Sequence, residues 1–183
     1  MLAALKHSLP IGDQWLYEPK LDGFRGLLRH RKNGHVQLLS RNLRDLAPSF
    51  PELVQAAPSL PAGTLLDGEI VIADESGHAD FGALQQRLTV ARRAAGQVAL
   101  RRPAVLLVCD VLELGGVPLT ELPLRNRRKR LEDFLPGLHP SLQLMAQTRD
   151  LALAQQWLAL VPALEGVWQR NLMATTRRGG ESG

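Results

Sequence analysis

The chain has 183 residues, of which 45% are hydrophobic and 22% charged, and these proportions are typical of a globular domain and exclude a globally disordered chain. A formal net charge of +4 and a pI near 9.8 permit a polyanionic partner without requiring one. The single cysteine, Cys109, excludes an internal disulfide, and no apolar run has the length of a signal peptide or membrane span, so we expect a cytoplasmic protein.

Three strands are predicted near the N-terminus, around a lysine. Residues 14–18 form a strand that leads into Lys20, and residues 24–30 form the strand that leaves it. Asn33-Gly34 is typical of a tight hairpin turn and joins the second strand to a third over residues 35–40. We expect the three strands to pair antiparallel around the lysine.

Two helices are predicted in the middle of the chain. Ser49, with Glu52 three residues later, has the spacing of a capping box and predicts a helix within residues 48–57. Asp80 is predicted to cap a second helix over residues 81–88. The basic, alanine-rich connector that follows is interpreted as a surface loop or a frayed helix.

The second half of the chain contains its most strand-like segment, residues 104–114, which Gly115-Gly116 ends with a turn. The remaining elements are expected in the order helix 123–134, strand 141–147, helix 151–161, strand 165–170 and a disordered tail at 173–183.

The predicted helix over residues 123–134 is strongly basic. Its basic residues alternate with apolar ones and are Arg125, Arg127, Arg128, Lys129 and Arg130. We interpret them as a solvated helix face, with contact to phosphate as the alternative.

The stretch from Glu18 to Arg25, Glu-Pro-Lys-Leu-Asp-Gly-Phe-Arg, contains the main candidate for a catalytic residue. A lysine held at a strand end by a tight turn is a candidate reactive amine that could be positioned against a phosphate. Asp and Gly are also the residues that ordinary turns require. The short motif alone therefore leaves a plain strand-turn-strand connection open.

A second unusual stretch is Asp67-Gly68-Glu69, which lies inside an otherwise apolar predicted strand over residues 64–73. Burying carboxylates is costly unless they are paired, solvated at a cleft or bound to a metal. The alternative is a β-bulge or strand-end turn with both acids in water.

The order of these motifs along the chain resembles the nucleotidyltransferase domain of ATP-dependent DNA ligases. The matching motifs are Lys20-x-Asp22-Gly23-x-Arg25, Ser40-Arg41-Asn42, Asp67-Gly68-Glu69, Asp110-Val111-Leu112 and Glu165-Gly166-Val167. RNA ligases and messenger-RNA capping enzymes share the lysine motif. The flanking residues favour the bacterial end-joining and repair DNA ligases.

The resemblance implies an adenylation domain over residues 1–172, incomplete at its C-terminus. The implied fold class is α+β, ATP-grasp-like, with antiparallel β-sheets, flanking helices and a nucleotide cleft between the sheets. The implied substrates are ATP and nicked or broken DNA.

The resemblance also implies roles for matched residues. Lys20 would attack the α-phosphorus of ATP, release pyrophosphate and hold AMP as a phosphoramidate before passing it to a DNA 5′-phosphate. Glu18 would recognise the amino group of adenine. Arg25 and Arg41 would contact the ribose or the phosphates.

Two further carboxylates are assigned in the same way. Glu69 would hold the ribose hydroxyl or a divalent metal ion, and Glu165 would bind that ion, which is expected to be Mg²⁺ or Mn²⁺.

Three features depart from the family pattern. Cys109 takes the place of an aromatic residue that stacks on adenine, and Arg170 takes the place of a lysine in the nucleotide site. The sequence also contains no strand with a Lys-x-Lys pair and no OB-fold domain. We therefore expect that nick sealing would need another chain to supply these elements.

Two functions remain open at this stage. The first is an adenylyltransferase that forms a lysine–AMP intermediate for joining DNA ends in repair, in a bacterial, nucleoid-associated protein. The second is a catalytically impaired ligase fragment that binds nucleotide or DNA without sealing. The matched residues favour the first function, whereas the three departures favour the second.

Overall fold

The computed structural model describes residues 9–160 and 166–176, so Glu165 and residues 177–183 of the predicted tail lie outside the described residues. The strands are β1 (Trp15–Lys20), β2 (Phe24–His30), β3 (Val36–Ser40), β4 (Thr64–Val71), β5 (Val105–Leu114), β6 (Val117–Pro118), β7 (Leu142–Leu144) and β8 (Gly166–Asn171). The helices are α1 (Pro51–Ala56), the 3-10 turn η1 (Ala57–Ser59), α2 (Phe81–Arg87), α3 (Arg92–Arg101), α4 (Leu124–Phe134) and α5 (Leu151–Leu160).

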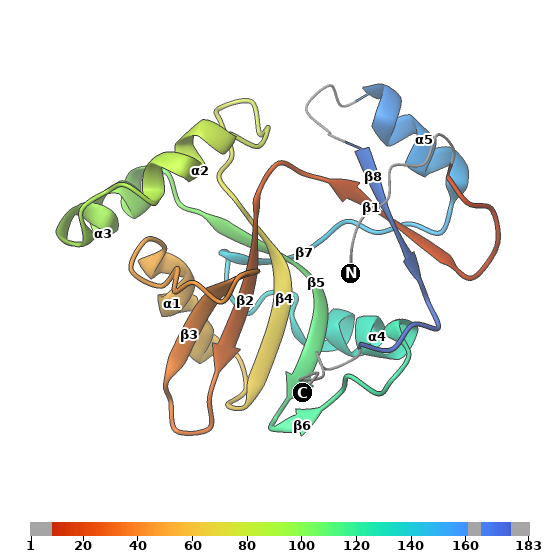
Figure 1. Cartoon of the computed structure of the whole chain (residues 1–183), viewed down its shortest axis with the longest axis horizontal. Helices are drawn as coiled ribbons and strands as arrows, with labels where there is room; N and C mark the ends of the chain where they lie inside the picture. The colour runs from red at the N-terminus through yellow and green to blue at the C-terminus, as the bar shows by residue number, and fades with distance from the viewer. Residues whose placement is uncertain (1–8, 161–165, 177–183) are drawn as a thin grey trace, which may run out of the picture.

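The strands form two sheets. β1 and β8 pair antiparallel as a two-stranded sheet, and a six-stranded sheet has the order β3-β2-β4-β5-β6, with β7 pairing parallel to β5. Figure 1 shows the smaller sheet and α5 together on one side of the larger sheet. The predicted α+β class, with antiparallel sheets and flanking helices, is confirmed.

The strand that carries Lys20 does not pair as predicted. We expected the first three strands to form one antiparallel unit, but β1 pairs with β8, while β2 pairs with β3 and β4. The Asp22-Gly23 turn therefore connects two sheets instead of closing a hairpin. Local turn chemistry cannot reveal this difference, because the partner of β1 lies near the other end of the sequence.

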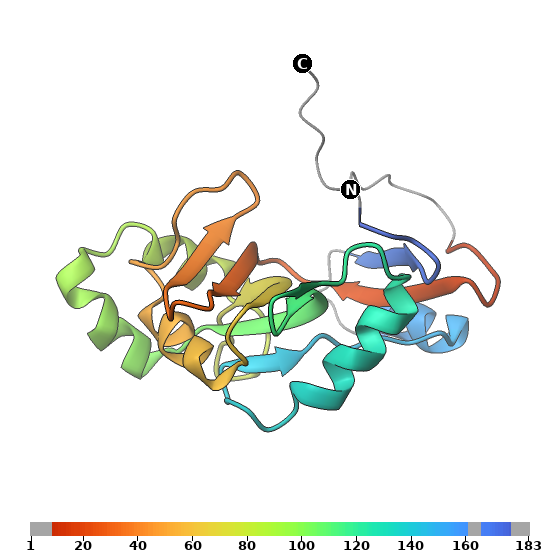
Figure 2. The ribbon, with the colours of Figure 1, turned by 90° about the horizontal axis from the view of Figure 1, so that it is seen from below.

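One face of the larger sheet carries the apolar core. Leu28, Leu66 and Leu106 from neighbouring strands are fully buried there, against Leu53 of α1 and Leu131 of α4. Figure 2 shows α1 and α4 on the same side of this sheet. Because strand residues alternate between faces, the intervening side chains of β2 and β4 are directed to the opposite face.

The polar residues on that opposite face line up across the strands. The register places Arg25 of β2 opposite Glu69 of β4, and Asp67 lies two residues from Glu69. These charged side chains therefore share one face at the end of the larger sheet that is nearest to the turn after Lys20.

The helix predictions have mixed outcomes. Asp80 caps α2 as predicted, since its Oδ1 accepts a hydrogen bond from the Ala83 backbone amide at 2.8 Å. The capping box is wrong, because α1 has Phe50 at its N-cap without a side-chain cap. Glu52 instead forms an ion pair with the buried guanidinium of Arg87 at 2.7 Å.

Other predicted element boundaries also differ from those in the structure. The basic connector after α2 contains a regular helix, α3, and the strand predicted over residues 141–147 is confined to β7. Ala174 and Thr176, in the segment predicted as a tail, form backbone hydrogen bonds with Leu124 and Thr120. Among the described residues, no helix is both long and apolar enough to cross a membrane.

The prediction of a solvated basic face on α4 is wrong for Arg127. Its side chain is buried and forms two hydrogen bonds with the carboxylate of Asp110, at 2.8 and 2.7 Å. A buried carboxylate needs such a partner, because an unpaired charge away from water is unstable. Arg125, Lys129 and Arg130 are exposed, as predicted.

Two glycines give opposite expectations for stability. A Cβ on Gly68 would lie 2.5 Å from the backbone oxygen of Leu107, so Gly68→Ala should destabilise the protein by about 1–3 kcal/mol or more. A Cβ on Gly96, in α3, would have no atom within 4 Å. Gly96→Ala should stabilise the protein by roughly 0.5–1 kcal/mol, because alanine is the better helix former.

Urea unfolding of both variants and the unaltered chain measures these changes. Equal stabilities of the two alanine variants would contradict the close approach of β4 and β5 at Gly68.

Candidate functional site

Lys20 lies at the junction of the two sheets. It is the last residue of β1, and Leu21, Asp22 and Gly23 connect it to β2. A Cβ on Gly23 would lie 2.7 Å from both the Glu69 side chain and the Ile70 backbone oxygen. Only glycine fits this turn without a shift, and the turn brings the strand of Lys20 close to the charged face of β4.

Lys20 faces Trp168 of the partner strand. In the β1–β8 register Lys20 is opposite Gly166 and Glu18 is opposite Trp168, so these side chains share one face of the smaller sheet. The Nζ atom of Lys20 lies 5.9 Å from the centroid of the Trp168 ring, which is within the range of a cation–π contact. The indole is 37% exposed.

Glu18 is buried in a polar cluster that joins both sheets. Its Oε2 accepts a hydrogen bond from Nε of Arg170 at 2.6 Å, and its Oε1 accepts one from Nε2 of Gln147. Burial raises the pKa of the Glu18 carboxyl group, while the charge of Arg170 acts in the opposite direction.

Cys109 completes this cluster from the larger sheet. Nη2 of Arg170 donates to the Cys109 sulfur at 3.1 Å, and the thiol donates to the backbone oxygen of Asp67 at 3.3 Å. Burial raises the pKa of the Cys109 thiol, so the thiol is neutral and serves as a weak hydrogen-bonding group. Three predicted site residues, Glu18, Cys109 and Arg170, are therefore in direct contact through one guanidinium.

A β-bulge places the acids and the cysteine. Asp67 pairs with Asp110 and the next residue, Gly68, pairs with Val108, so Cys109 has no opposite residue. An extra residue of this kind bends the strand and redirects its side chains. The bulge explains how Cys109 and Asp110, although adjacent in sequence, are both buried beside polar partners.

The Asp67-Gly68-Glu69 stretch combines features of both predictions. The bulge is present, but Asp67 is buried and its carboxylate accepts two hydrogen bonds from Arg25, at 2.9 and 2.5 Å. Asp67 is therefore a paired carboxylate, and it holds the guanidinium of Arg25 in place.

Glu69 differs from its neighbours. Within the described part of the chain, its carboxylate has no hydrogen bond or ion pair. Burial and the charge of Asp67 raise the pKa of Glu69 to about 7, although Arg25 and Lys20 oppose the shift. Glu69 is therefore a carboxyl group near Lys20 that holds its proton to a higher pH than an ordinary glutamate.

Arg41 lies outside the Glu18 cluster. It is exposed in the turn after β3, one residue beyond Ser40, which pairs with Gly26 of β2. This register brings Arg41 to the same end of the larger sheet as Arg25 and Glu69.

A metal ion would find few protein ligands among the described residues. No group of three or more His, Cys, Asp or Glu side chains suited to a metal occurs in residues 9–160 and 166–176. Mg²⁺ is commonly held by one or two carboxylates together with substrate phosphates. The unpaired carboxylate of Glu69 fits that arrangement, and Glu165 lies outside the described residues.

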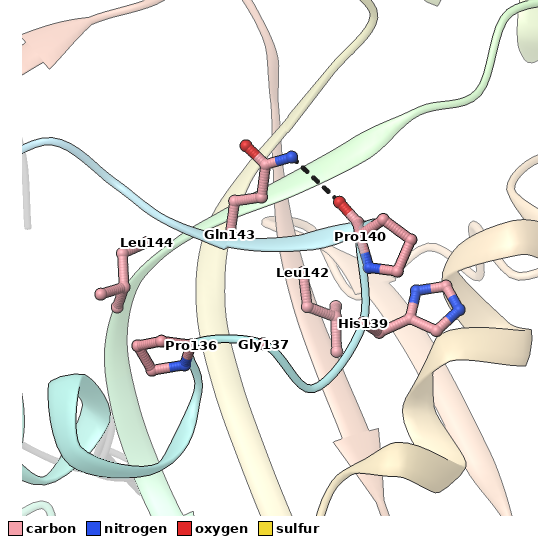
Figure 3. A pocket seen from close by; sticks show the side chains of 7 residues that line it. All are labelled: Pro136, Gly137, His139, Pro140, Leu142, Gln143 and Leu144. Carbon is pink, nitrogen blue, oxygen red and sulfur yellow. Dashed lines mark hydrogen bonds between the residues drawn. The ribbon is translucent and has the colours of Figure 1, made fainter.

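A surface hollow of about 300 Å³ lies between the end of α4 and β7. Figure 3 shows its lining by side chains from residues 136–144, where Gln143 donates to the Pro140 backbone oxygen at 3.0 Å. No Lys or Arg and none of the predicted site residues lines it. The hollow is therefore poorly suited to a phosphate-bearing ligand.

Sequence reasoning missed two polar partners and one aromatic residue. Asp67 was visible as an acid in an apolar strand, but its pairing with Arg25 depends on the sheet register. Gln147 and Trp168 gave no signal, because their proximity to Glu18 and Lys20 depends on β1 pairing across the whole chain.

Comparison with known proteins identifies close similarity to DNA ligases. Residues 1–175 match the family described as ATP dependent DNA ligase domain. DNA ligase C2 of Mycolicibacterium smegmatis is 40% identical over 158 residues, which cover 86% of this chain and 44% of that protein. The multifunctional non-homologous end joining protein LigD of Pseudomonas aeruginosa is 36% identical over 182 residues, covering 96% of this chain and 20% of LigD.

Solved structures show the same fold. A mycobacterial DNA ligase D complexed with ATP and MES has a TM-score of 0.71 and 29% identity, covering 91% of this chain and 51% of that one. The Chlorella virus DNA ligase-adenylate, at 16% identity and a TM-score of 0.59, shares the fold. The chain spans 44% of the length of ligase C2, 20% of LigD of Pseudomonas aeruginosa and 60% of the Chlorella virus ligase.

The raised pKa of Glu69 predicts a pH-dependent stability. Between about pH 4.5 and 7 the folded protein keeps a proton on Glu69 that the unfolded chain releases, so this contribution to stability is lost as pH rises through that window. The loss should reach roughly 3 kcal/mol. Glu69→Gln, which stays neutral, should remove it.

Urea unfolding from pH 4.5 to 8 tests this expectation. Glu121→Gln, at an exposed position, serves as the control and should keep the pH dependence of the unaltered chain. Parallel stability curves for Glu69→Gln and the unaltered chain would refute the assignment to Glu69.

Proposed function

The chain belongs to the family of ATP-dependent DNA ligase domains, and we propose that residues 1–172 act as an adenylyltransferase that forms a covalent lysine–AMP for joining DNA ends in repair. The observation that carries the proposal is the position of Lys20 at the sheet junction, between Trp168 and the charged face that contains Arg25 and Glu69. The identity to bacterial ligases over most of the chain supports it.

The proposed nucleophile is the Nζ atom of Lys20. An amine attacks only in its neutral form, so the ammonium group first loses a proton. Nζ then forms a bond to the α-phosphorus of ATP and releases a second proton to solvent, while the bond from that phosphorus to the bridging oxygen breaks and pyrophosphate leaves. AMP remains on Lys20 as a phosphoramidate until a DNA 5′-phosphate oxygen displaces the lysine.

Positioning and charge neutralisation are the main demands of such a transfer. Arg25 is already oriented by Asp67 and presents a planar guanidinium, which binds two phosphate or ribose oxygens at once. Arg41 would add a second positive charge from the end of β3. Both arginines would thus contact the sugar-phosphate part of the nucleotide.

The base would bind beside the Glu18 cluster. Glu18 and Lys20 are on the same face of β1, two residues apart, which is about 7 Å along a strand. This spacing would place the adenine amino group at Glu18 while the α-phosphate meets Lys20. Cys109 and Arg170 would form part of the wall of the base site.

We assign the divalent ion, Mg²⁺ or Mn²⁺, to Glu69 and Glu165. When bound, this ion would supply positive charge to the phosphate oxygens. The Glu69 carboxylate would be ionised in that state, since a neighbouring cation favours the charged form of an acid.

Covalent adenylation of Lys20 is the direct test. After incubation of the purified chain with ATP and Mg²⁺, intact-protein mass spectrometry should show the addition of one AMP. Lys20→Ala should abolish the adduct, whereas Lys129→Ala, at an exposed position on α4, should retain it. Absence of the adduct from the unaltered chain, or its persistence in Lys20→Ala, would overturn the proposed chemistry.

A matched pair of arginines on β2 tests the phosphate contact. Arg25 and Arg29 each form an ion pair with an acid on another strand of the larger sheet, Asp67 on β4 and Glu113 on β5, but only Arg25 lies at the site end of the sheet. Arg25→Lys should slow adenylation about 10- to 100-fold, because a bidentate charge-assisted contact is lost.

Arg29→Lys should change the rate by no more than about threefold, because any effect would come from a surface ion pair alone. Single-turnover measurement of the AMP adduct compares the two variants. Equal rates for both would show that Arg25 does not contact the nucleotide.

A further inference from the structure

Gln147 bridges the two sheets beside Glu18. The segment after β7 leaves the larger sheet and runs along the free edge of β1, where the backbones of Thr148 and Tyr17 exchange two hydrogen bonds of 2.8 and 3.0 Å. Gln147 precedes this bridge. Its amide nitrogen donates to Oε1 of Glu18 on β1 and to the backbone oxygen of Cys109 on β5, the latter at 3.4 Å.

The other end of this amide has no protein partner. Within the described residues, the Oε1 atom of Gln147 is buried and accepts no hydrogen bond. A buried carbonyl oxygen without a donor is unfavourable, and such atoms are uncommon in native proteins. This unpaired acceptor lies inside the cluster, next to the carboxylate of Glu18, and has almost no surface exposed to solvent.

Exchanging the oxygen and nitrogen positions of the Gln147 amide does not give a better set of hydrogen bonds. In that orientation the Gln147 oxygen would face Oε1 of Glu18, and two acceptors would oppose each other. The donor to Glu18 therefore fixes which end of the amide is the nitrogen. The position of the unpaired oxygen follows from this contact.

We propose that Gln147 reads the base: its Oε1 accepts a hydrogen bond from the exocyclic amino group of adenine, while its Nε2 holds Glu18 in place. This inference rests on the proposed function, which puts adenine at Glu18. An exocyclic amino group has two N–H bonds, so Glu18 and Gln147 would each accept one. The carboxylate can do so while bonded to Arg170 and Gln147, because its two oxygens offer about four acceptor sites.

The same arrangement would select against guanine. Guanine carries a carbonyl oxygen where adenine carries the amino group. That oxygen would face two acceptors, Oε1 of Gln147 and the carboxylate of Glu18. Gln147 would thus be a specificity-determining residue for ATP over GTP.

Equilibrium binding separates a direct contact from a structural role. The dissociation constants of ATP and of purine riboside triphosphate, which lacks the 6-amino group, are measured by calorimetry in a Lys20→Ala chain that cannot turn over. Gln147→Met, which keeps the length but removes the hydrogen-bonding groups, should weaken ATP binding about tenfold. The affinity for purine riboside triphosphate should change less than about twofold.

Gln143→Met supplies the control. It alters an exposed position on β7, the strand just before the segment that carries Gln147, and should change neither constant.

Equal weakening of both nucleotides by Gln147→Met would overturn the proposal, because it would show a purely structural role. This outcome leaves the adenylation of Lys20 untouched. A different result would separate the two proposals. If no AMP adduct forms on Lys20 but the preference for ATP still depends on Gln147, the proposed adenylation is overturned and the proposed base site is retained.

Discussion

The ion pair between Glu18 and Arg170 is the contact on which the arrangement of the site depends. It joins β1, near the start of the chain, to β8, near its end, and both charges are largely buried. Removing either partner would leave an uncompensated charge away from water, which is strongly destabilising. The pair therefore favours the β1–β8 register that places Lys20 and Trp168 on one face and turns the Asp22-Gly23 connection toward the larger sheet.

The charges around this pair follow a simple pattern. Among the described residues, each of the three buried acids has its own arginine: Glu18 has Arg170, Asp67 has Arg25 and Asp110 has Arg127. The half-buried Glu69 has no arginine bonded to it in this way, and burial and the charge of Asp67 raise its pKa. A partly buried carboxylate outside any ion pair, close to the proposed nucleophile, is a position where an external cation or a ribose hydroxyl would be stabilised.

The sequence predicted local structure well and long-range pairing poorly. The hairpin at Asn33-Gly34 and the Asp80 cap depend on neighbouring residues and are confirmed. The pairing of β1 with β8, the burial of Arg127 and the use of Glu52 as a partner for Arg87 depend on residues far apart in the chain. Resemblance selected Glu18, Cys109 and Arg170, which do converge, but it gave no indication that Gln147 lies beside Glu18.

Cys109 and Arg170, the two positions that depart from the family pattern, form one physical unit. Arg170 reaches Cys109 with its Nη2 atom at 3.1 Å while its Nε binds Glu18, so the guanidinium lies directly beside the small thiol. An aromatic ring extending from position 109 would compete with that guanidinium for the same space. A lysine at position 170 could not form both contacts through a planar fork. Cysteine and arginine are therefore mutually compatible here. In the proposed base site they would present a charged, hydrogen-bonded wall in place of a stacking surface.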